Sequence, residues 1–355
     1  MPILASDLDA GNQNGYTFTV ASASYIIKTN VVLMSNFVGV VDAAEFDLCW
    51  VVNNGTIIAG TGIYTAGDQV LVNNGVNGEI NATTCIAVGG GENAVISNYG
   101  VLAGLFDGIN ISDAGRTTVI NAGAISAIYA IESRDTSDVF IDNSGSIVGD
   151  FYSIVIDGSS SVRVANSGEL TGTLRLDGSS YASLINSGEI TGDVIFGSGA
   201  DIFKGKGGTV TDRISGNDGN DRLIAGDDGE WFSGGAGNDT ITGGKGEDSF
   251  IFDSNFNKHT NVDQIRHFSH ADDTFELLNL LFLDMKEGYL ASDAFKLISG
   301  PKSTKGVDAS DRILYDKAHG DLYFDRDGAG DVYERQKFAH LHEGVAVDAS
   351  DFLVA

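Results

Sequence analysis

A nine-residue period between Gly207 and Ile251 is the feature that most constrains how this chain can fold. Two copies, GGAGNDTIT from Gly234 and GGKGEDSFI from Gly243, fit the pattern G-G-x-G-x-D-x-U-x at every fixed place, where U is apolar. The apolar eighth places of five copies keep a strict step of nine: Ile214, Leu223, Phe232, Ile241 and Phe250. The three residues around each apolar place predict a short strand with one side chain inward, and the glycines predict a sharp turn with positive φ.

The sixth places of the same copies are acidic: Asp212, Asp221, Glu230, Asp239 and Asp248. Two half-turns make one coil of eighteen residues, so alternate acids are expected to stack on one edge. The expected pairs are Asp212 with Glu230, Glu230 with Asp248, and Asp221 with Asp239. Without a cation between them, the carboxylates of each pair would repel one another.

Calcium fits these turns best, because it takes about six to eight hard oxygen ligands and a glycine-rich turn exposes carbonyl oxygens beside each carboxylate. Magnesium demands a tight octahedron and keeps its waters, and no Cys or His lies among the repeats to suit zinc. We therefore predict that several Ca²⁺ ions are bound. The predicted metal-site residues are Asp212, Gly216, Asp218, Gly219, Asp221, Gly226, Asp228, Glu230, Gly234, Gly235, Gly237, Asp239, Gly243, Gly244, Gly246 and Asp248.

A single Gly-Asn-Asp run would be an ordinary turn with solvated carboxylates, but five copies in phase favour calcium. The copies do decay: Val210 stands where the first copy needs glycine, and Asp228 and Glu230 are substitutions in the third. Sites that touch these turns are predicted to be weaker or empty. A partial copy, GSGADIF from Gly197, sets Asp201 eleven residues before Asp212 and is interpreted as a junction.

The repeats resemble those of the repeats-in-toxin (RTX) proteins, and the resemblance covers about residues 197 to 355. It implies a calcium-binding parallel β-roll at residues 197–252. It also implies a secreted, extracellular protein that leaves a Gram-negative bacterium by type I export, with the type I secretion apparatus as a partner.

Residues at both ends agree with this expectation. The last five residues, one acid followed by four apolar residues, resemble the uncleaved C-terminal signal of such proteins. The first twenty residues hold no basic residue and no apolar stretch of signal-peptide length, so classical secretion is not expected. The sequence has no run of about eighteen apolar residues, so no membrane span is expected either.

The charge is strongly acidic: 49 acids against 21 bases give a net charge of −28. This argues against nucleic acid and anionic membranes as partners. Metal-free repeats would repel themselves, so we expect the C-terminal region to be largely disordered where calcium is scarce and to fold outside the cell.

The N-terminal half predicts a second solenoid, because an N-x-G signature returns at steps near 22 residues. The signature asparagines are Asn53, Asn73, Asn98, Asn121, Asn143, Asn166 and Asn186. One coil of a right-handed parallel β-helix needs about that many residues for three short strands and their turns. The apolar residues around Val155, Leu174 and Val194 would fill its interior. The alternative is a β-sandwich with regularly spaced turns.

We therefore predict an all-β chain of four parts. Residues 1–48 lack the signature and are interpreted as an N-terminal cap, 49–196 as the parallel β-helix, 197–252 as the β-roll, and 253–355 as a capping and secretion-signal module. Cys49 and Cys85 fall at different offsets from the repeat, and two cysteines are too few for a disulfide scaffold.

The last part resembles the serralysin-like capping module that follows such repeats. The spacing of apolar residues predicts an amphipathic helix over residues 273–288, followed by hairpins. All six histidines lie after the repeats and are interpreted as surface or hairpin positions: His259, His267, His270, His319, His340 and His342. Asp325, Asp327 and Asp331 could hold another calcium ion, but a tight turn between two strands is favoured.

Parallel β-helices often carry polysaccharide lyases, hydrolases and epimerases, but residues 1–200 contain no histidine and five bases: Lys28, Arg116, Arg134, Arg163 and Arg175. The absence of H-E-x-x-H argues against a metalloprotease. We expect the β-helix to be a surface-binding or adhesin-like module for polysaccharide or a cell surface, with no catalytic residues. The alternative is a polysaccharide-modifying enzyme of the lyase or epimerase type.

Overall fold

The structure is a computed structural model that describes residues 3–4, 6–11, 13, 15–18, 23–42, 48–330 and 332–355. Its described residues divide into two compact units, residues 1–195 and 196–355. Strands dominate both units, and the helices in the described ranges are two 3-10 turns, η1 (Ser292–Ala294) and η2 (Ala349–Asp351). No helix among the described residues is long and apolar enough to cross a lipid bilayer.

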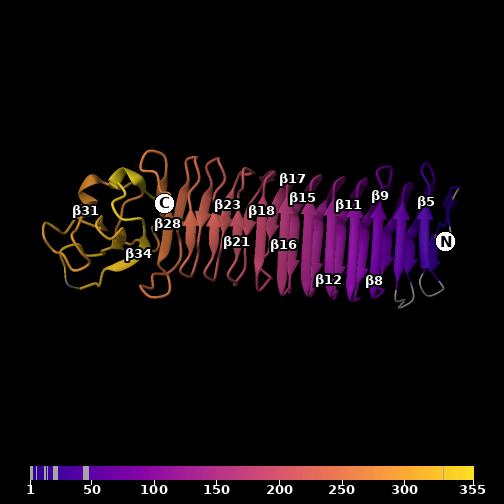
Figure 1. Ribbon diagram of the computed structural model, residues 1–355, viewed down its shortest axis with the longest axis horizontal. Coiled ribbons are helices and arrows are strands. Elements are labelled where there is room, and N and C mark those ends of the chain that lie inside the picture. Colours follow the sequence, from indigo (N-terminus) through magenta and orange to yellow (C-terminus); the bar gives the residue numbers. More distant parts are fainter. Residues whose placement is uncertain are drawn as a thin grey trace. The chain divides into compact units, whose positions relative to one another are not determined.

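The N-terminal unit is a parallel β-solenoid built from two rows of strands, and within each row the strands of successive coils lie side by side (Figure 1). The first row consists of β1 (Ile3–Leu4), β4 (Ala23–Ile27), β6 (Cys49–Asn53), β8 (Gln69–Asn74), β10 (Asn93–Asn98), β12 (Arg116–Asn121), β14 (Asp138–Asn143), β16 (Ser161–Asn166) and β18 (Ala182–Asn186). The second consists of β2 (Leu8–Asp9), β3 (Tyr16–Phe18), β5 (Val32–Asp42), β7 (Thr56–Thr65), β9 (Glu79–Gly89), β11 (Val101–Ser112), β13 (Ala124–Arg134), β15 (Ser146–Asp157), β17 (Glu169–Arg175), β19 (Glu189–Thr191) and β20 (Val194–Ile195). Successive coils pair in parallel, which excludes the antiparallel β-sandwich.

Each central coil contains two strands, where the sequence predicted three. The long second strand breaks its register in the middle, between Ala103 and Asp107 in β11 and between Ala127 and Tyr129 in β13. An irregularity of this kind bends a strand without ending it, so one strand covers two faces of the coil. The predicted second and third strands are therefore a single bent strand.

A buried ladder of asparagines explains the N-x-G signature. The Nδ2 of each asparagine donates to the Oδ1 of the asparagine one coil further on, at 2.8 Å in every case. Its members are Asn53, Asn74, Asn98, Asn121, Asn143, Asn166 and Asn186, all at most 2% exposed. In the second coil of the ladder, the member is Asn74 and not the predicted Asn73, because the strand register pairs Asn74 with Asn53 and Asn98.

The interior of this unit is apolar, as predicted: Val155, Leu174 and Val194 are all at most 2% exposed. Cys49 and Cys85 are both buried and are not joined by a disulfide. The described strands of residues 1–48 pair in parallel with those that follow, β4 with β6 and β5 with β7. The four-part division of the chain stays a prediction.

The C-terminal unit begins with the repeats, whose strands alternate between two parallel rows. The first row consists of β21 (Ile202–Lys204), β24 (Arg222–Ile224), β26 (Thr240–Thr242) and β28 (Asp263–Arg266). The second consists of β22 (Thr209–Val210), β23 (Arg213–Ser215), β25 (Trp231–Ser233), β27 (Ser249–Phe252) and β29 (Thr274–Leu277). Leu223 pairs with Ile241 and Phe232 with Phe250, so one coil takes eighteen residues. All five predicted inward residues are at most 1% exposed, which confirms the β-roll.

The helix predicted over residues 273–288 is wrong. Residues 274–277 form strand β29, which pairs in parallel with β27 and with β35 (Phe352–Val354). Phe275 is fully buried, with its ring centroid 4.3 Å from that of Phe268 and 5.1 Å from that of Phe352. Pairing with two neighbouring strands buries this segment more completely than a surface helix would, so the tertiary context overrides the local pattern.

The predicted hairpins are present in the rest of this unit. Its remaining strands are β30 (Gly288–Tyr289), β31 (Phe295–Leu297), β32 (Ile313–Asp316), β33 (Asp321–Phe324) and β34 (Gln336–His340). Strand β33 pairs antiparallel with both β32 and β34.

Candidate calcium sites

The glycine-rich turns of the roll stack directly on one another. Gly219 and Gly237 have φ angles of +137° and +152°, which favour glycine strongly. A Cβ added to Gly237 would lie 1.4 Å from the carbonyl oxygen of Gly219, and one on Gly235 would lie 2.0 Å from that of Asn217. Glycine thus allows each turn to come close to the carbonyl oxygens of the turn before it.

On one edge, four acids form a column: Asp201, Asp221, Asp239 and Asp263, all at most 4% exposed. The backbone N–H of each of the first three donates to the carboxylate of the acid in the next coil. The N-to-Oδ1 distances are 2.7 Å from Asp201 to Asp221, 2.8 Å from Asp221 to Asp239, and 3.1 Å from Asp239 to Asp263. This bond fixes the orientation of each carboxylate and leaves its second oxygen for another partner.

On the other edge, Glu230, Asp248 and Asp273 form a second column by the same rule. The backbone nitrogen of Glu230 lies 3.0 Å from Oδ1 of Asp248, and that of Asp248 lies 3.0 Å from Oδ1 of Asp273. Turn residues add donors: the N–H of Gly226 binds Oε1 of Glu230 at 3.1 Å, and that of Gly244 binds Oδ2 of Asp248 at 2.7 Å.

Three carboxylate oxygens in these columns are buried and lack a hydrogen-bond partner: Oδ2 of Asp221, Oδ2 of Asp239 and Oε2 of Glu230. A Cβ on Gly216 would lie 2.3 Å from Oδ2 of Asp221 and 2.5 Å from the carbonyl oxygen of Gly234. Buried oxygens without a donor are costly. A hard cation between the turns would satisfy them, and the all-oxygen donor set fits Ca²⁺.

The electrostatics of the columns favour a cation as well. Burial, reinforced by the charges of Asp239 and Asp201, raises the pKa of Asp221 to about 8. Burial and the charge of Asp248 raise the pKa of Glu230 to about 8. Burial is also the main reason that the pKa values of Asp239 and Asp273 rise to about 6 and that of Asp263 well above its usual range. Without a metal ion, ionisation of these buried carboxyl groups is therefore unfavourable, and a bound cation would stabilise their charged form.

The structure brings together four of the predicted acidic ligands, Asp221, Glu230, Asp239 and Asp248, within the two columns. Asp212 is exposed, unlike the acids of the two columns, and accepts a hydrogen bond from the Thr211 hydroxyl at 3.5 Å. The strand register pairs Arg213 with Trp231 and therefore sets Asp212 level with Glu230, so the pair of Asp212 and Glu230 stays a prediction. Asp218 and Asp228 are also exposed, beside the columns.

Three acids of the columns were not predicted as ligands. Asp201 lies in the segment interpreted as a junction, and Asp263 and Asp273 lie after the last repeat. The last two follow the preceding acid of their column after 24 and 25 residues, so a search at a step of nine misses them. The signal that could have found them is an acid two places before a buried apolar residue, as in Asp263 before Ile265.

Parallel coils with buried acid columns at glycine turns define a calcium-binding β-solenoid protein. Comparison with family models agrees: residues 206–229 and 224–257 match the RTX calcium-binding nonapeptide repeat, in four copies. The chain therefore carries RTX calcium-binding repeats, as the sequence predicted. No curated protein matches the chain.

Three histidines of the C-terminal unit, His270, His319 and His340, have a ring nitrogen within hydrogen-bond distance of a carboxylate. Nδ1 of His270 lies 2.7 Å from Oδ1 of Asp351, at the 3-10 turn η2. Nδ1 of His319 lies 2.7 Å from Oδ2 of Asp316, in the hairpin of β32 and β33. These contacts agree with the predicted hairpin and surface positions.

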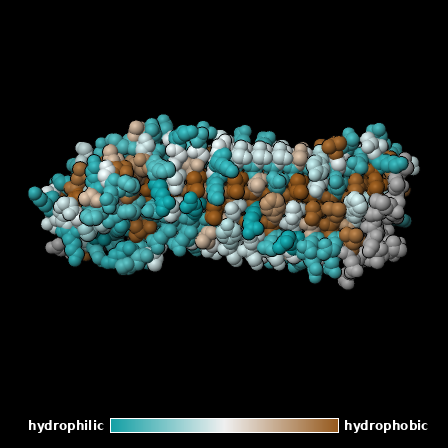
Figure 2. Space-filling model, in the orientation of Figure 1, coloured by the Kyte–Doolittle hydropathy of each residue, from teal (hydrophilic) through white to brown (hydrophobic). Residues whose placement is uncertain are grey.

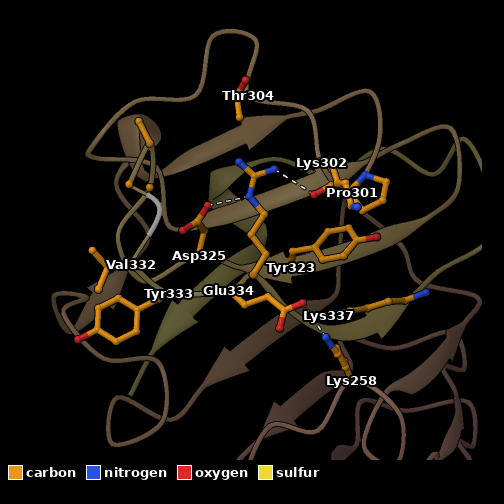
Figure 3. Close-up of a pocket in the computed structure, with 14 residues that line it drawn as sticks. Lys258, Pro301, Lys302, Thr304, Tyr323, Asp325, Val332, Tyr333, Glu334 and Lys337 are labelled. Atoms are coloured by element: carbon orange, nitrogen blue, oxygen red, sulfur yellow. Dashed lines mark hydrogen bonds and ion pairs between the residues drawn. The ribbon is translucent and has the colours of Figure 1, made fainter.

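The acidic turn after β33 borders a cavity of about 580 Å³, shown in Figure 3. Asp325 is 2% exposed, and its Oδ2 accepts from Nε of Arg335 at 2.8 Å. Oδ2 of Asp327 accepts from the backbone of Val332 at 2.8 Å. Because Arg335 already neutralises Asp325, these contacts favour the tight turn over a further calcium site. Asp331 lies outside the described residues.

Proposed function

We propose that calcium binding to the two acid columns drives folding of the C-terminal unit once the protein is outside the cell. The observation that supports this most directly is the set of buried carboxylate oxygens without hydrogen-bond partners. Extracellular calcium modules have dissociation constants of about 10⁻⁴ to 10⁻³ M. At ten times that concentration, each site contributes about 1.4 kcal/mol, so three sites contribute about 4 kcal/mol, close to the net stability of a domain.

Calcium titration of the full chain tests this proposal. Circular dichroism should show a cooperative gain of β signal as calcium is added, and calorimetry should count several ions. Equal β signal in calcium and in chelator would contradict calcium-driven folding. Export by a type I apparatus, predicted from the resemblance, is tested by co-expressing the chain with such an apparatus and assaying the medium.

We propose further that the N-terminal solenoid is a surface-binding, adhesin-like module. Its outer surface exposes large apolar side chains where the long strands bend: Phe37 is 55% exposed, Phe106 52% and Phe151 59%. Figure 2 shows hydrophobic residues in a band over the strands of this unit, bordered by hydrophilic ones. Exposed apolar patches of this kind are typical of binding surfaces. Retention of the protein on immobilised polysaccharides, with the polymer unchanged, would support the adhesin.

A second candidate, a polysaccharide-modifying enzyme, rests on Glu132 in β13. This carboxylate is 5% exposed, pairs with Arg134 and accepts from Nδ2 of Asn110 at 2.8 Å. Burial raises its pKa, Arg134 opposes the shift, and Asp107 and Asp157 add to it. A carboxyl group with a raised pKa near other carboxylates is suited to general acid catalysis. Release of reducing ends or unsaturated sugars that disappears in Glu132→Gln would favour this candidate.

A further inference from the structure

The arginines of the N-terminal unit differ in how far their charge is neutralised. Residues 1–195 contain four arginines. Arg134 pairs with Glu132, and Arg175 lies 2.8 Å from Asp177 and 5.7 Å over the ring of Tyr152. Arg116 has only a long contact of 3.8 Å with Asp138, with 70% of its side chain exposed. Arg163 is exposed and makes no ion pair with any residue that the structure describes.

The two less neutralised arginines border the same cavity, which has a volume of about 460 Å³ on the outer face of β12, β14 and β16. The residues that line it and could meet a ligand are Arg116, Thr118, Asp138, Phe140, Ser161 and Arg163. They form two rows across the strands. Arg116, Asp138 and Ser161 are paired in register in one row, and Thr118, Phe140 and Arg163 are paired in the other.

Strand geometry gives the size of this arrangement. Neighbouring strands lie about 4.8 Å apart, and residues two places apart along a strand are separated by about 6.8 Å and face the same side. Arg116 and Arg163 stand at opposite corners of the two rows, so their Cα atoms are about 12 Å apart. Phe140 and Asp138 lie between the arginines on the central strand, with the Phe140 side chain 39% exposed.

We propose that this cavity binds an acidic oligosaccharide, a chain of sugars that carry carboxylate or sulfate groups. The inference rests on the proposed surface-binding function and assigns it a site. Phe140 presents an apolar ring face on which the C–H face of a sugar ring can pack. The arginines present planar forks of donors that match carboxylate or sulfate oxygens.

Asp138 favours a sugar over a free inorganic anion as the ligand of this cavity. Its carboxylate lies beside Arg116, where it repels a bare sulfate or phosphate but accepts hydrogen bonds from sugar hydroxyls. The hydroxyl groups of Thr118 and Ser161 add neutral donors and acceptors. The mixture of cations, one acid, hydroxyls and an aromatic ring suits a polar ligand with a separate charged group.

The row that contains Phe140 extends beyond the cavity. From Thr118 it continues through Val95 and Leu71 to Trp50, each paired in register with the next. The Trp50 side chain is 39% exposed and stands four strands from Phe140, about 19 Å away. An oligosaccharide that crosses the strands can therefore pack on both aromatic rings, so longer oligomers should bind more tightly than short ones.

The test uses the full chain in calcium, with hexagalacturonate and a sulfated heparin hexasaccharide as acidic probes, cellohexaose as the neutral probe, and sodium sulfate as the free anion. The variants are Arg163→Gln, Arg116→Gln and Phe140→Ala. Arg175→Gln is the matched control, because it removes the same charge from the other row of strands. Circular dichroism in calcium confirms that each variant is folded, and calorimetry measures binding.

At least one acidic hexamer should bind, and each arginine variant should weaken it by about tenfold to a hundredfold, the effect of one charge-assisted hydrogen bond. Phe140→Ala should weaken it by about tenfold, and Arg175→Gln should leave it within about twofold. If acidic hexamers bind the wild type and both arginine variants equally, the site is wrong while the surface-binding function stands. If no hexamer binds, both proposals fail, and preference for cellohexaose or for sulfate alone overturns the acidic-sugar assignment.

Discussion

Replacement of Asp239 by asparagine should stabilise the protein without calcium and should lose this gain in calcium. Asp239 stands between Asp221 and Asp263 in the first column, and its carboxylate accepts the N–H of Asp221 at 2.8 Å. Asparagine keeps an oxygen for this bond but removes the charge. Burial raises the pKa of Asp239 from 3.8 to about 6. Near neutral pH, ionised Asp239 therefore destabilises the metal-free fold by about 3 kcal/mol.

The sign follows from proton linkage. The folded state binds the proton more tightly than the unfolded state, so this group contributes stability that is complete below pH 3.8 and is lost as the pH rises through about 6. Without calcium at neutral pH, Asp239→Asn should thus stabilise the C-terminal unit by up to about 3 kcal/mol. With calcium, the variant also loses a ligand of the sites on either side, at about 1.4 kcal/mol per site at tenfold saturation, so the gain of about 3 kcal/mol should fall close to zero.

Urea unfolding followed by circular dichroism, in calcium and in chelator, measures both values. The matched control is Asp212→Asn, which removes the same charge from an exposed position outside the columns and should change neither value by more than about 0.5 kcal/mol. A destabilisation of Asp239→Asn by the same amount in both conditions would refute the argument, because it would mean that the carboxylate acts through packing alone.

Three further substitutions or treatments test other parts of the fold. In thermal unfolding with calcium, Gly237→Ala should lower the free energy of unfolding by at least about 2 kcal/mol, because its Cβ would meet a backbone oxygen 1.4 Å away. The Cβ of Gly207→Ala meets open space, so this variant should lower the free energy of unfolding by only about 1 kcal/mol. Asn121→Ala should cost about 1 to 3 kcal/mol in urea unfolding, and Asn73→Ala, outside the ladder, less than about 0.5 kcal/mol. Burial raises the pKa of Cys85 to about 12, so thiol reagents should label it only on unfolding, and stability should fall as the pH rises from 9 toward 12. An equal loss of stability in the two glycine variants or in the two asparagine variants, or fast labelling of Cys85 in the folded protein, would contradict these expectations.

The sequence predicted most where a period was strict. The step of nine alone places Leu223 and Ile241 inside the roll and Asp221 and Asp239 on one edge. The prediction was wrong where one local pattern allows two choices of residue. In Asn73-Asn74-Gly75, either asparagine could join the ladder, and only the pairing with neighbouring coils selects Asn74.

The remaining errors arise from long-range contacts. Residues 273–288 show apolar spacing that fits a helix, but Phe275 is held between strands that come from distant parts of the chain. Asp263 and Asp273 join the columns because inserted loops lengthen their coils, and loop length does not disturb stacking at the strands. Contacts of this kind depend on register between coils, which local spacing alone does not determine.

The asparagine ladder sets where a coil repeats but not how many coils there are. Each rung donates to the next rung and accepts from the one before, and the steps between rungs vary from 20 to 24 residues. Loops outside the ladder absorb this difference, while donors and acceptors at the two open faces of any coil remain the same. Gain or loss of a whole coil by duplication or deletion of its coding segment would therefore leave every hydrogen bond with a partner. The length of the N-terminal unit, and with it the reach of its outer surface, can change in evolution by steps of one coil without the invention of a new fold.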